Sequence, residues 1–437
     1  MTTPPTAKKS SDVFGISNTI HIDSYIDRGS LDEKMGVLLA RPQHIALKAP
    51  SKAGKTWLRK KVLLNPIEVQ CRIDQKVDDI YISALSTLGI KLTINRTTRN
   101  SFSGHAEVEA EGGFKLFAAA RARLFGSAAH ETTTEHQELK QSIQNLDFIA
   151  ECIKESGRRL VVEDFHYLSR EQRSLFAFEL KALWELGVFV IVVGVWEETN
   201  YLLSLNHDLS AKVEEVPVTW THDDLKAILT SGGAALDVRF SDKVVDELIG
   251  LSYGSAGIFQ ALTLKTLDAA GIFHKQAALT EITDLALVSE AAAGYAQQIR
   301  SIYGDFAKKV TNGIRQRKNS TGIYAHAMKA IMECSDDQLM AGVSTHNIFK
   351  VAHARQNRIQ LNNLRNILGK LETLHTDSEG RGLIIQYNAD DDKVSVVDHQ
   401  LLLYRKFRED PWPWDEVLAE MDSHSSNETG YEADTSE

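Results

Sequence analysis

The sequence predicts an α/β core built on a parallel sheet, followed by helices and a smaller module of three helices and a β-hairpin. Short apolar runs alternate with helical patterns through the first half of the chain, which is typical of a parallel sheet covered on both faces. One run leads into a loop ending in Gly-Lys-Thr, and a later run ends in two adjacent acids. Together these observations indicate a core that binds phosphate groups.

Length and composition are those of a folded protein with more than one domain. The chain has 437 residues, of which 43% are apolar and 25% are charged, and it is long enough for two or three domains. No apolar run is long enough to cross a membrane, and the N-terminus lacks the apolar segment of a signal peptide. We therefore expect a cytoplasmic protein without a membrane partner.

The net charge of −10 is unevenly distributed. Residues 409–437 contain ten acids and no Lys or Arg, which predicts an acidic, disordered tail and accounts for the whole net charge. Residues 300–370 contain twelve Lys and Arg against four Asp and Glu, a local charge of +8. This contrast favours an anionic partner for one module.

The elements predicted for the first half define the core domain. Residues 1–19 are rich in Thr, Pro, Ser and Lys and are predicted to be a flexible leader. The core follows at 20–221, with an insertion at about 90–134 where Gly, Asn, Thr and Ser interrupt the pattern. The predicted strands are 44–48, 67–73, 159–163, 188–194 and 213–218, with helical patterns at about 136–156 and 170–186 between them.

Two further domains are predicted after the core. Residues 222–300 contain four helical patches and are expected to form a helical lid. Residues 301–408 contain three helical patterns and two strands, in the order of a winged helix-turn-helix. The helices are predicted at 323–334, 344–353 and 360–374, and the strands at 382–387 and 393–398.

A phosphate-binding loop is predicted between the first strand and a following helix. It consists of Ala49, Pro50, Ser51, Lys52, Ala53, Gly54, Lys55 and Thr56. The last three residues match the end of the pattern GxxxxGK[ST], whereas Ala49 stands where the first glycine is usual. Lys55 would neutralise phosphate oxygens and Thr56 would offer its hydroxyl to Mg²⁺, so the expected cofactors are ATP and Mg²⁺. The alternative is an ordinary turn of small residues.

The adjacent acids Glu163 and Asp164 close the third predicted strand. Hydrolysis of a nucleoside triphosphate needs one acid to hold Mg²⁺ and a neighbouring acid to act as general base on water. We assign Glu163 to the metal and Asp164 to the base, although the usual order is Asp then Glu. After the fourth strand, Glu197, Thr199 and Asn200 are candidates to sense the γ-phosphate, or they simply cap the next helix.

These motifs and their layout resemble the AAA+/STAND division of P-loop ATPases. The resemblance is carried by the Ala-Pro-x-x-x-Gly-Lys-Thr loop, by residues 161–166 at the acidic strand end, and by the order of lid and winged helix. It implies a parallel-sheet P-loop NTPase core with a helical lid and a C-terminal winged helix-turn-helix. It also implies ATPase activity, nucleotide-dependent homo-oligomers, and Tyr25 or Arg28 as a neighbour of the adenine.

Two departures from that family pattern favour a slow nucleotide switch over a fast ring motor. The lid segment 253–258 has no Arg, and Lys212 stands where an Arg often reaches a neighbouring subunit's nucleotide. In layout the chain is similar to origin-recognition initiators and to regulatory ATPases of transposition or phage defence. The pathway stays open, because fold-level likeness does not choose among replication, mobile-element, transcription and antiviral defence settings.

DNA is the predicted ligand of the winged helix. The candidate contacts are Lys350, Arg355, Arg358 and Arg365, on or beside its second and third helices. The acidic run 390–392 at the tip of the wing would repel phosphates, so the contacts are expected to come from the helices. The alternative is a nucleotide-bound scaffold with negligible hydrolysis, whose winged helix recognises another protein.

Overall fold

By its contacts the chain divides into two compact units. The core unit comprises Asp27–Ala49 and Gly54–Thr219, and the lid unit comprises Met1–Ile26, Pro50–Ala53 and Trp220–Glu437. The computed structural model describes residues 7–96, 102–108, 113, 115–116, 118–120, 123, 146–196, 199–312, 321–371 and 384–429. Four residues of the predicted phosphate loop therefore group with the lid unit.

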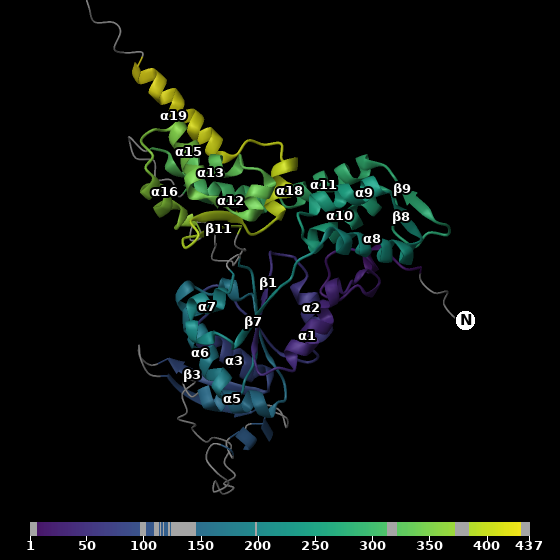
Figure 1. Cartoon of the computed structure of the whole chain (residues 1–437), viewed down its shortest axis with the longest axis vertical. Helices are drawn as coiled ribbons and strands as arrows, with labels where there is room; N and C mark the ends of the chain where they lie inside the picture. The colour runs from purple at the N-terminus through teal and green to yellow at the C-terminus, as the bar shows by residue number, and fades with distance from the viewer. Residues whose placement is uncertain are drawn as a thin grey trace, which may run out of the picture. The chain divides into compact units, whose positions relative to one another are not determined.

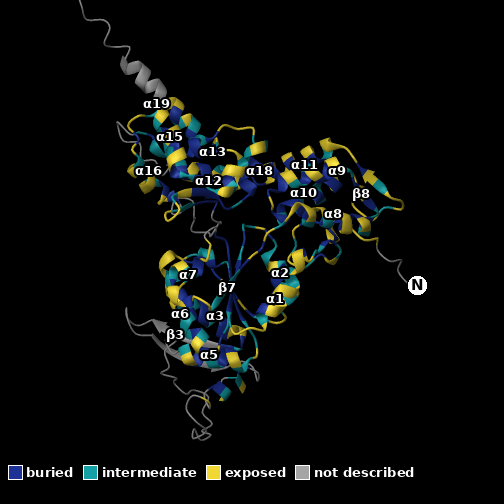
Figure 2. Ribbon diagram, viewed as in Figure 1, coloured by how far each residue is buried: buried dark blue, intermediate teal, exposed yellow. Residues whose placement is uncertain are grey.

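The core unit is built on a five-stranded parallel sheet in the order β2-β5-β6-β1-β7. All five predicted strands are confirmed. They are β1 (His44–Lys48), β2 (Ile67–Gln70), β5 (Leu160–Glu163), β6 (Val190–Gly194) and β7 (Val213–Pro217). Every residue of β5 and β6 is buried, because helices cover both faces of the sheet, and the strands accordingly stand out in dark blue in Figure 2.

Helices α1 and α2 lie on one face of this sheet, and α3, α5, α6 and α7 lie on the other (Figure 1). Their bounds are α1 Leu31–Leu39, α2 Lys55–Val62, α3 Val77–Thr87, α5 Leu146–Glu155, α6 Arg170–Glu185 and α7 Tyr201–Leu205. The connection from β1 to β2 crosses the sheet in one direction, and the later connections return in the other. Since such crossovers are right-handed, the two sets of helices cover opposite faces.

The carboxyl ends of the central strands meet at one edge of the sheet. Lys48 at the end of β1 pairs with Gly194 at the end of β6. Glu163 at the end of β5 pairs with Gln70 at the end of β2. Ligands of open α/β sheets bind outside this edge, so both predicted phosphate-site motifs begin where a nucleotide would be held.

His44, the first residue of β1, makes hydrogen bonds to α6 and β6. Its side chain is fully buried, with Nε2 2.8 Å from the carbonyl oxygen of Leu180, and its Nδ1 accepts a hydrogen bond of 2.9 Å from the amide of Val190. Burial lowers the pKa of His44 to about 4. The imidazole is therefore neutral at pH 7, as the bond from Val190 requires.

The insertion after α3 begins with an antiparallel hairpin, β3 (Ile90–Arg96) and β4 (Phe102–Val108). Ile90 at the start of β3 pairs with Val108 at the end of β4, and the two strands form a sheet separate from the parallel one. The sequence predicted an insertion at about 90–134 but no hairpin. Most of the insertion after β4, and residues 136–145 of the helical pattern predicted at about 136–156, lie outside the described residues.

The lid unit contains a helical layer that follows the four helical patches of the sequence. Its elements are α8 (His222–Leu236), β8 (Val238–Phe240), α9 (Asp242–Ser252), α10 (Ala256–Ala269), β9 (Thr280–Ile282) and α11 (Leu285–Gln298). Strands β8 and β9 form a short parallel pair at the edge of the layer.

The segment predicted as a flexible leader differs from that expectation from residue 7 onward. Val13 and Phe14 are fully buried, and the amide of Ser10 donates to the carbonyl of Phe273 at 3.0 Å. A Cβ added to Gly232 would lie 2.4 Å from Phe14 Cζ, so α8 accommodates this ring only because it has glycine there. Two apolar residues thus hold the segment against the helical layer.

The C-terminal part of the lid unit contains helices and a three-stranded antiparallel sheet in the order β10-β12-β11. Its elements are α12 (Arg300–Asn312), α13 (Ile323–Met332), α14 (Asp336–Ala341), β10 (Val343–Ser344), α15 (Thr345–Arg355), α16 (Leu361–Leu368), β11 (Ile385–Asn388), β12 (Lys393–Val396) and α18 (Gln400–Phe407). The three helices and two strands predicted here are present. Helices α12, α14 and α18 and strand β10 were not predicted, and α14 and β10, with six and two residues, are too short to show a period.

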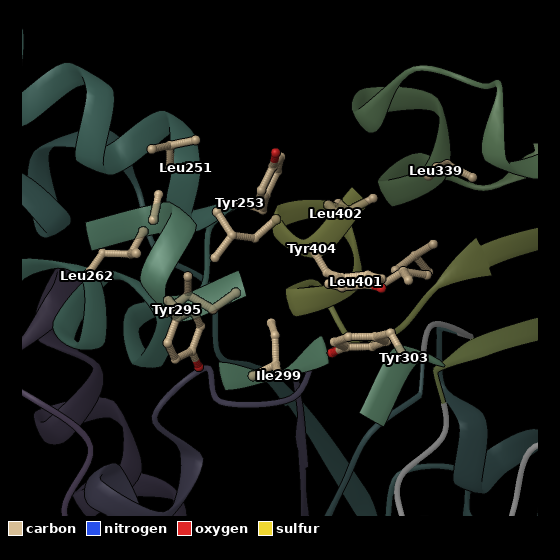
Figure 3. Packing of buried hydrophobic residues seen from close by; sticks show 14 of the residues in the cluster. Leu251, Tyr253, Leu262, Tyr295, Ile299, Tyr303, Leu339, Leu401, Leu402 and Tyr404 are labelled. Carbon is tan, nitrogen blue, oxygen red and sulfur yellow. The ribbon is translucent and has the colours of Figure 1, made fainter. Parts of the chain in front are cut away.

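The helical layer and the C-terminal elements share one hydrophobic core, part of which Figure 3 shows. Leu251 and Leu262 of the layer and Leu401 of α18 belong to the same buried cluster. One hydrogen bond joins the two parts, since Tyr295 Oη of α11 donates to Gln400 Oε1 of α18 at 2.6 Å. A second lies within the C-terminal part, where Tyr303 Oη of α12 donates to Asp398 Oδ2 at 2.7 Å. Lid and C-terminal module are thus joined by packing, not only by the chain.

The structure differs from the predicted disordered tail, because α19 spans Pro413–Thr429. Trp412 and Trp414 are buried, with stacked rings 4.7 Å apart, and together they offer far more apolar surface than a solvated tail would. Asp415 pairs with Lys329 at 3.1 Å, and Asp410 pairs with Arg300. Tail acids therefore neutralise part of the basic segment. Within the described ranges, no helix has the length and apolar character needed to cross a membrane.

Candidate nucleotide-binding site

The phosphate loop connects β1 to α2 with an unusual backbone. Within it, Lys52 (φ 59°) and Gly54 (φ 84°) adopt the left-handed conformation, and Ala49 does not. A residue with ordinary φ tolerates a Cβ, which explains how alanine replaces the usual first glycine. A lysine held left-handed is costlier, and such strain is common where a loop wraps a ligand.

Lys55 and Thr56 open the first turn of α2. The Lys55 ammonium donates a hydrogen bond of 2.9 Å to the carbonyl oxygen of Ala49, which holds the charge over the loop. Amides at a helix N-terminus are partly positive, so charge, dipole and the Thr56 hydroxyl all favour an anion with a bound cation at this place.

One strand, β6, separates β1 from the acidic strand β5. The core unit has the P-loop NTPase fold.

Glu163 ends β5 inside a buried ion network. Its Oε1 lies 2.6 Å from Nε of Arg59, a residue of α2 whose side chain is 2% exposed, while another Arg59 nitrogen lies 2.9 Å from Oε1 of Glu68. Burial raises the pKa of Glu163, and the Arg59 charge opposes that rise. This ion pair therefore connects helix α2 directly to Glu163, the first of the two acids.

Asp164 stands one residue beyond the strand in the left-handed conformation, with φ 55°. Its Oδ2 accepts a hydrogen bond of 3.0 Å from Nε2 of Gln70, at the end of the neighbouring strand β2. The two acids therefore have different partners, Arg59 for Glu163 and Gln70 for Asp164.

His166 lies in the short helix after the acids, and its imidazole is neutral. Burial, together with the positive charges of Lys55 and Arg173, lowers the pKa of His166 to about 3. Its Nδ1 is buried and has no hydrogen-bond partner among the residues that the structure describes. A neutral imidazole beside Lys55 has an unused polar atom close to the phosphate loop.

The middle of the phosphate loop is bonded within the lid unit. The carbonyl oxygen of Lys52 accepts a hydrogen bond of 2.8 Å from the amide of Gly257 and one of 3.3 Å from the Ser255 hydroxyl, at the start of α10. The indole Nε1 of Trp220 donates to the carbonyl of Ala53 at 2.8 Å. The left-handed turn at Lys52 is therefore fixed by residues of the lid.

The two residues predicted to lie near the adenine fall in different units. Tyr25 follows η2 (Ile22–Ser24) in the lid unit, and Arg28 begins η3 (Arg28–Ser30) in the core unit, where its side chain is buried. Their role stays a prediction. Of the candidate γ-phosphate sensors, Glu197 lies outside the described residues, and the amide of Asn200 donates to Glu215 at the start of α7.

The oxygen donors of the core unit fit Mg²⁺. A hydroxyl at Thr56 and carboxylates at Glu163 and Asp164 are hard ligands of the kind that Mg²⁺ prefers, usually one or two at a time beside substrate phosphates. Over the described ranges, no cluster of three or more His, Cys, Asp or Glu could hold a metal unaided. The donor set therefore suits a cation that arrives with a nucleotide.

The residues predicted to contact DNA are partly committed to internal ion pairs. Arg365 on α16 lies 2.7 Å from Asp392 in the turn between β11 and β12, and Arg355 pairs with Glu333. Lys350 is exposed on α15, and Nε of Arg358 donates to Gln356 at 3.4 Å. Two of the four predicted contacts would have to exchange an acid for a phosphate.

Comparisons with known proteins give distant structural neighbours and no close relative. No family model and no curated protein matches the chain. The Walker-type ATPase PABY2304 of Pyrococcus abyssi is 14% identical, with a TM-score of 0.49 over 88% of this chain and 95% of that one. Cdc6p from Pyrobaculum aerophilum is 10% identical, with a TM-score of 0.36 over 87% and 93%. A STAND protein with a tetratricopeptide repeat sensor, from Pyrococcus horikoshii, is 11% identical, with a TM-score of 0.36 over 92% of this chain and 44% of that one.

Sequence reasoning missed the partners that organise this site. Arg59 and Gln70 hold the two acids, and Gly257 holds the loop. A charged residue on the side of α2 that faces the sheet was a signal that could have identified Arg59. Nothing in the local sequence pairs Gly257 with Lys52, because the two lie about two hundred residues apart.

Proposed function

We propose that this protein is a regulatory ATPase that binds ATP with Mg²⁺ on the loop from Ala49 to Thr56 and hydrolyses it slowly. Its nucleotide state would control a C-terminal winged-helix module, predicted at residues 301–408. Three features support the nucleotide: the loop between β1 and α2, the positive end of α2, and the two acids at the end of β5.

The observation that carries the switch is the hydrogen bond from the amide of Gly257 to the carbonyl of Lys52. Phosphates are gripped by loop amides, so a change in the loop on binding or hydrolysis must strain or release this bond. Because the lid shares a hydrophobic core with the C-terminal elements, that strain would reach the module. The nucleotide would thus shift the populations of two lid states.

Each residue of the site has a role in this proposal. Lys55 neutralises phosphate oxygens, and Thr56 and Glu163 hold Mg²⁺, which supplies positive charge to the β- and γ-phosphate oxygens when bound. Asp164 acts as general base and takes a proton from the attacking water. The bond from Gln70 keeps the Asp164 carboxylate oriented in the meantime.

DNA is the proposed ligand of the winged-helix module. The order of helices and strands from α13 to β12, with the sheet order β10-β12-β11, supports the winged-helix assignment. Exposed Lys350 and the amide-rich face of α16, with exposed Asn362 and Asn363, support contact with a nucleic acid. Nucleotide-dependent self-association is a further expectation of this proposal.

A second candidate is a nucleotide-bound scaffold that recognises protein. It is favoured by one specific observation, the pairing of Arg365 with Asp392, which removes a positive charge from the face that DNA would approach. A surface of paired charges and amides suits a polar protein partner as well as it suits DNA.

Replacing Lys55 with alanine tests the proposal. We expect Lys55→Ala to abolish ATP binding, measured by calorimetry with MgCl2, and to leave thermal unfolding unchanged, because Lys55 lies outside the hydrophobic core. Lys61→Ala is the matched control, since it removes a positive charge from the exposed side of the same helix. Equal ATP affinity in Lys55→Ala and the parent would refute the assignment.

A further inference from the structure

The ion pair between Arg59 and Glu163 joins the two halves of the phosphate site. Arg59 lies on α2, three residues after Thr56, and Glu163 is the first acid at the end of β5. Their Nε and Oε1 atoms are 2.6 Å apart, and the two side chains are 2% and 10% exposed. Charges are buried in this way only when their partners are fixed.

The geometry of the pair restrains one oxygen of a flexible side chain. A glutamate has one more rotatable bond than an aspartate, so a carboxylate here needs a partner to hold its direction. Arg59 binds Oε1 through Nε, and another of its nitrogens forms an ion pair of 2.9 Å with Glu68 on β2. The guanidinium thus has acids on two strands beside it, and a carboxylate bound through one oxygen keeps a second for another partner.

We propose that Arg59 is a positioning residue for the cation of the nucleotide site: by holding Oε1 of Glu163, it presents the remaining carboxylate oxygen to Mg²⁺. This inference rests on the proposed function, in which Glu163 is the metal acid. Partners that orient metal-binding carboxylates typically contribute 10- to 100-fold to metal affinity. Because Arg59 belongs to α2, a movement of that helix would also move the Glu163 carboxylate that is proposed to hold the metal.

The test measures how the affinity for the ATP analogue AMPPNP depends on MgCl2, so no turnover is needed. The variants are Arg59→Met, Glu163→Gln and the two combined, with Lys61→Met as a control on the same helix. We expect Arg59→Met to raise the MgCl2 concentration at half-maximal tightening by roughly 10- to 100-fold, and to leave AMPPNP affinity in EDTA unchanged. Glu163→Gln should have a similar effect, and Lys61→Met none.

The double variant decides whether Arg59 acts through Glu163. Once Glu163 is Gln, losing Arg59 should leave the MgCl2 midpoint where Glu163→Gln alone puts it, because the effects of residues acting through one another do not add. A further shift of tenfold or more in the double variant overturns the inference, and so does a lower midpoint in Arg59→Met.

The double variant also keeps the experiment decisive if Arg59→Met does not fold. Arg59→Met alone leaves the buried Glu163 unpaired and can fail to fold, whereas the double variant buries no isolated charge. If the single variant does not fold, the comparison of the double variant with Glu163→Gln still decides. A parent protein that does not bind AMPPNP refutes the proposed function, while binding with a midpoint indifferent to Arg59 refutes this inference alone.

Discussion

The amide of Gly257, in the first turn of α10, donates a hydrogen bond of 2.8 Å to the carbonyl oxygen of Lys52 in the middle of the phosphate loop. The approach is so close that a Cβ on Gly257 would lie 2.7 Å from Lys52 Cβ and 2.8 Å from Lys52 O. Glycine is therefore required here by contact with the loop and not by its own backbone. The contact supports the left-handed turn at Lys52.

Gly257→Ala should weaken nucleotide binding by displacing the loop. The added methyl must push Lys52 away, and phosphate-binding amides tolerate little displacement, so we expect a loss of about tenfold or more in ATP affinity by calorimetry. Gly250→Ala on α9 is the matched control, because nothing outside the adjoining backbone of the same helix lies within 4 Å of its Cβ position, and alanine favours a helix. Equal affinities for the two variants would contradict the role given to this contact.

Asp164→Asn should separate ATP binding from hydrolysis. The amide retains an oxygen beside Gln70 but no longer accepts a proton, so turnover should fall by roughly 10² to 10⁴ while ATP affinity stays within a few-fold. Phosphate release measures the first quantity and calorimetry the second, with Glu171→Gln on the exposed side of α6 as a control. Normal turnover in Asp164→Asn together with loss in Glu163→Gln would reverse the two roles.

His44 should make the core unit lose stability in mild acid. Its pKa is about 4 in the folded chain and near 6.5 when unfolded, so between these values the unfolded chain binds more protons. The free energy of unfolding should therefore fall by up to about 3 kcal/mol as the pH drops from 6.5 to 4. Urea unfolding at several pH values measures the slope.

Two variants isolate the contribution of His44. Gln in its place can donate to Leu180 and accept from Val190 without titrating, so His44→Gln should flatten the dependence between pH 4 and 6.5. His274→Gln, at an exposed position, should leave the slope unchanged. The explanation fails if His44→Gln keeps the full slope of the parent.

The salt dependence of DNA binding should distinguish DNA from protein as the ligand of the C-terminal module. If Arg355, Arg358 and Arg365 each neutralise one phosphate, the slope of log affinity against log salt should fall by about 0.9 for each residue replaced by Ala. Asp392→Asn should strengthen binding, because it frees Arg365 and removes an acid that repels phosphate. Mobility shifts at several salt concentrations measure both effects.

An exposed lysine outside the C-terminal module provides the control for the DNA experiment. Lys243→Ala removes an exposed charge from α9, far along the chain from the module, and should not change the slope. Absence of binding by the parent at low salt, or an unchanged slope in the triple variant, would assign the module to protein recognition.

Local sequence determined the strands, the loop and the acids of this protein. Continuous apolar runs such as 190–194 suit strands that are buried on both faces, as in a parallel sheet, and the Gly-Lys-Thr end of the loop marks the place where α2 begins. The same local patterns predicted the four helical patches of the lid and the helices at α13, α15 and α16.

Only the tertiary structure decided the partners of these residues. Arg59 reaches Glu163 across about a hundred residues, and Gly257 reaches Lys52 across about two hundred, so neither pairing leaves a periodic signal. The tail was predicted to be disordered from its charge, yet the tertiary fold buries Trp412 and Trp414 and pairs Asp415 with Lys329. Charge and propensity act locally, whereas burial and ion pairing depend on which distant segments the fold brings into contact.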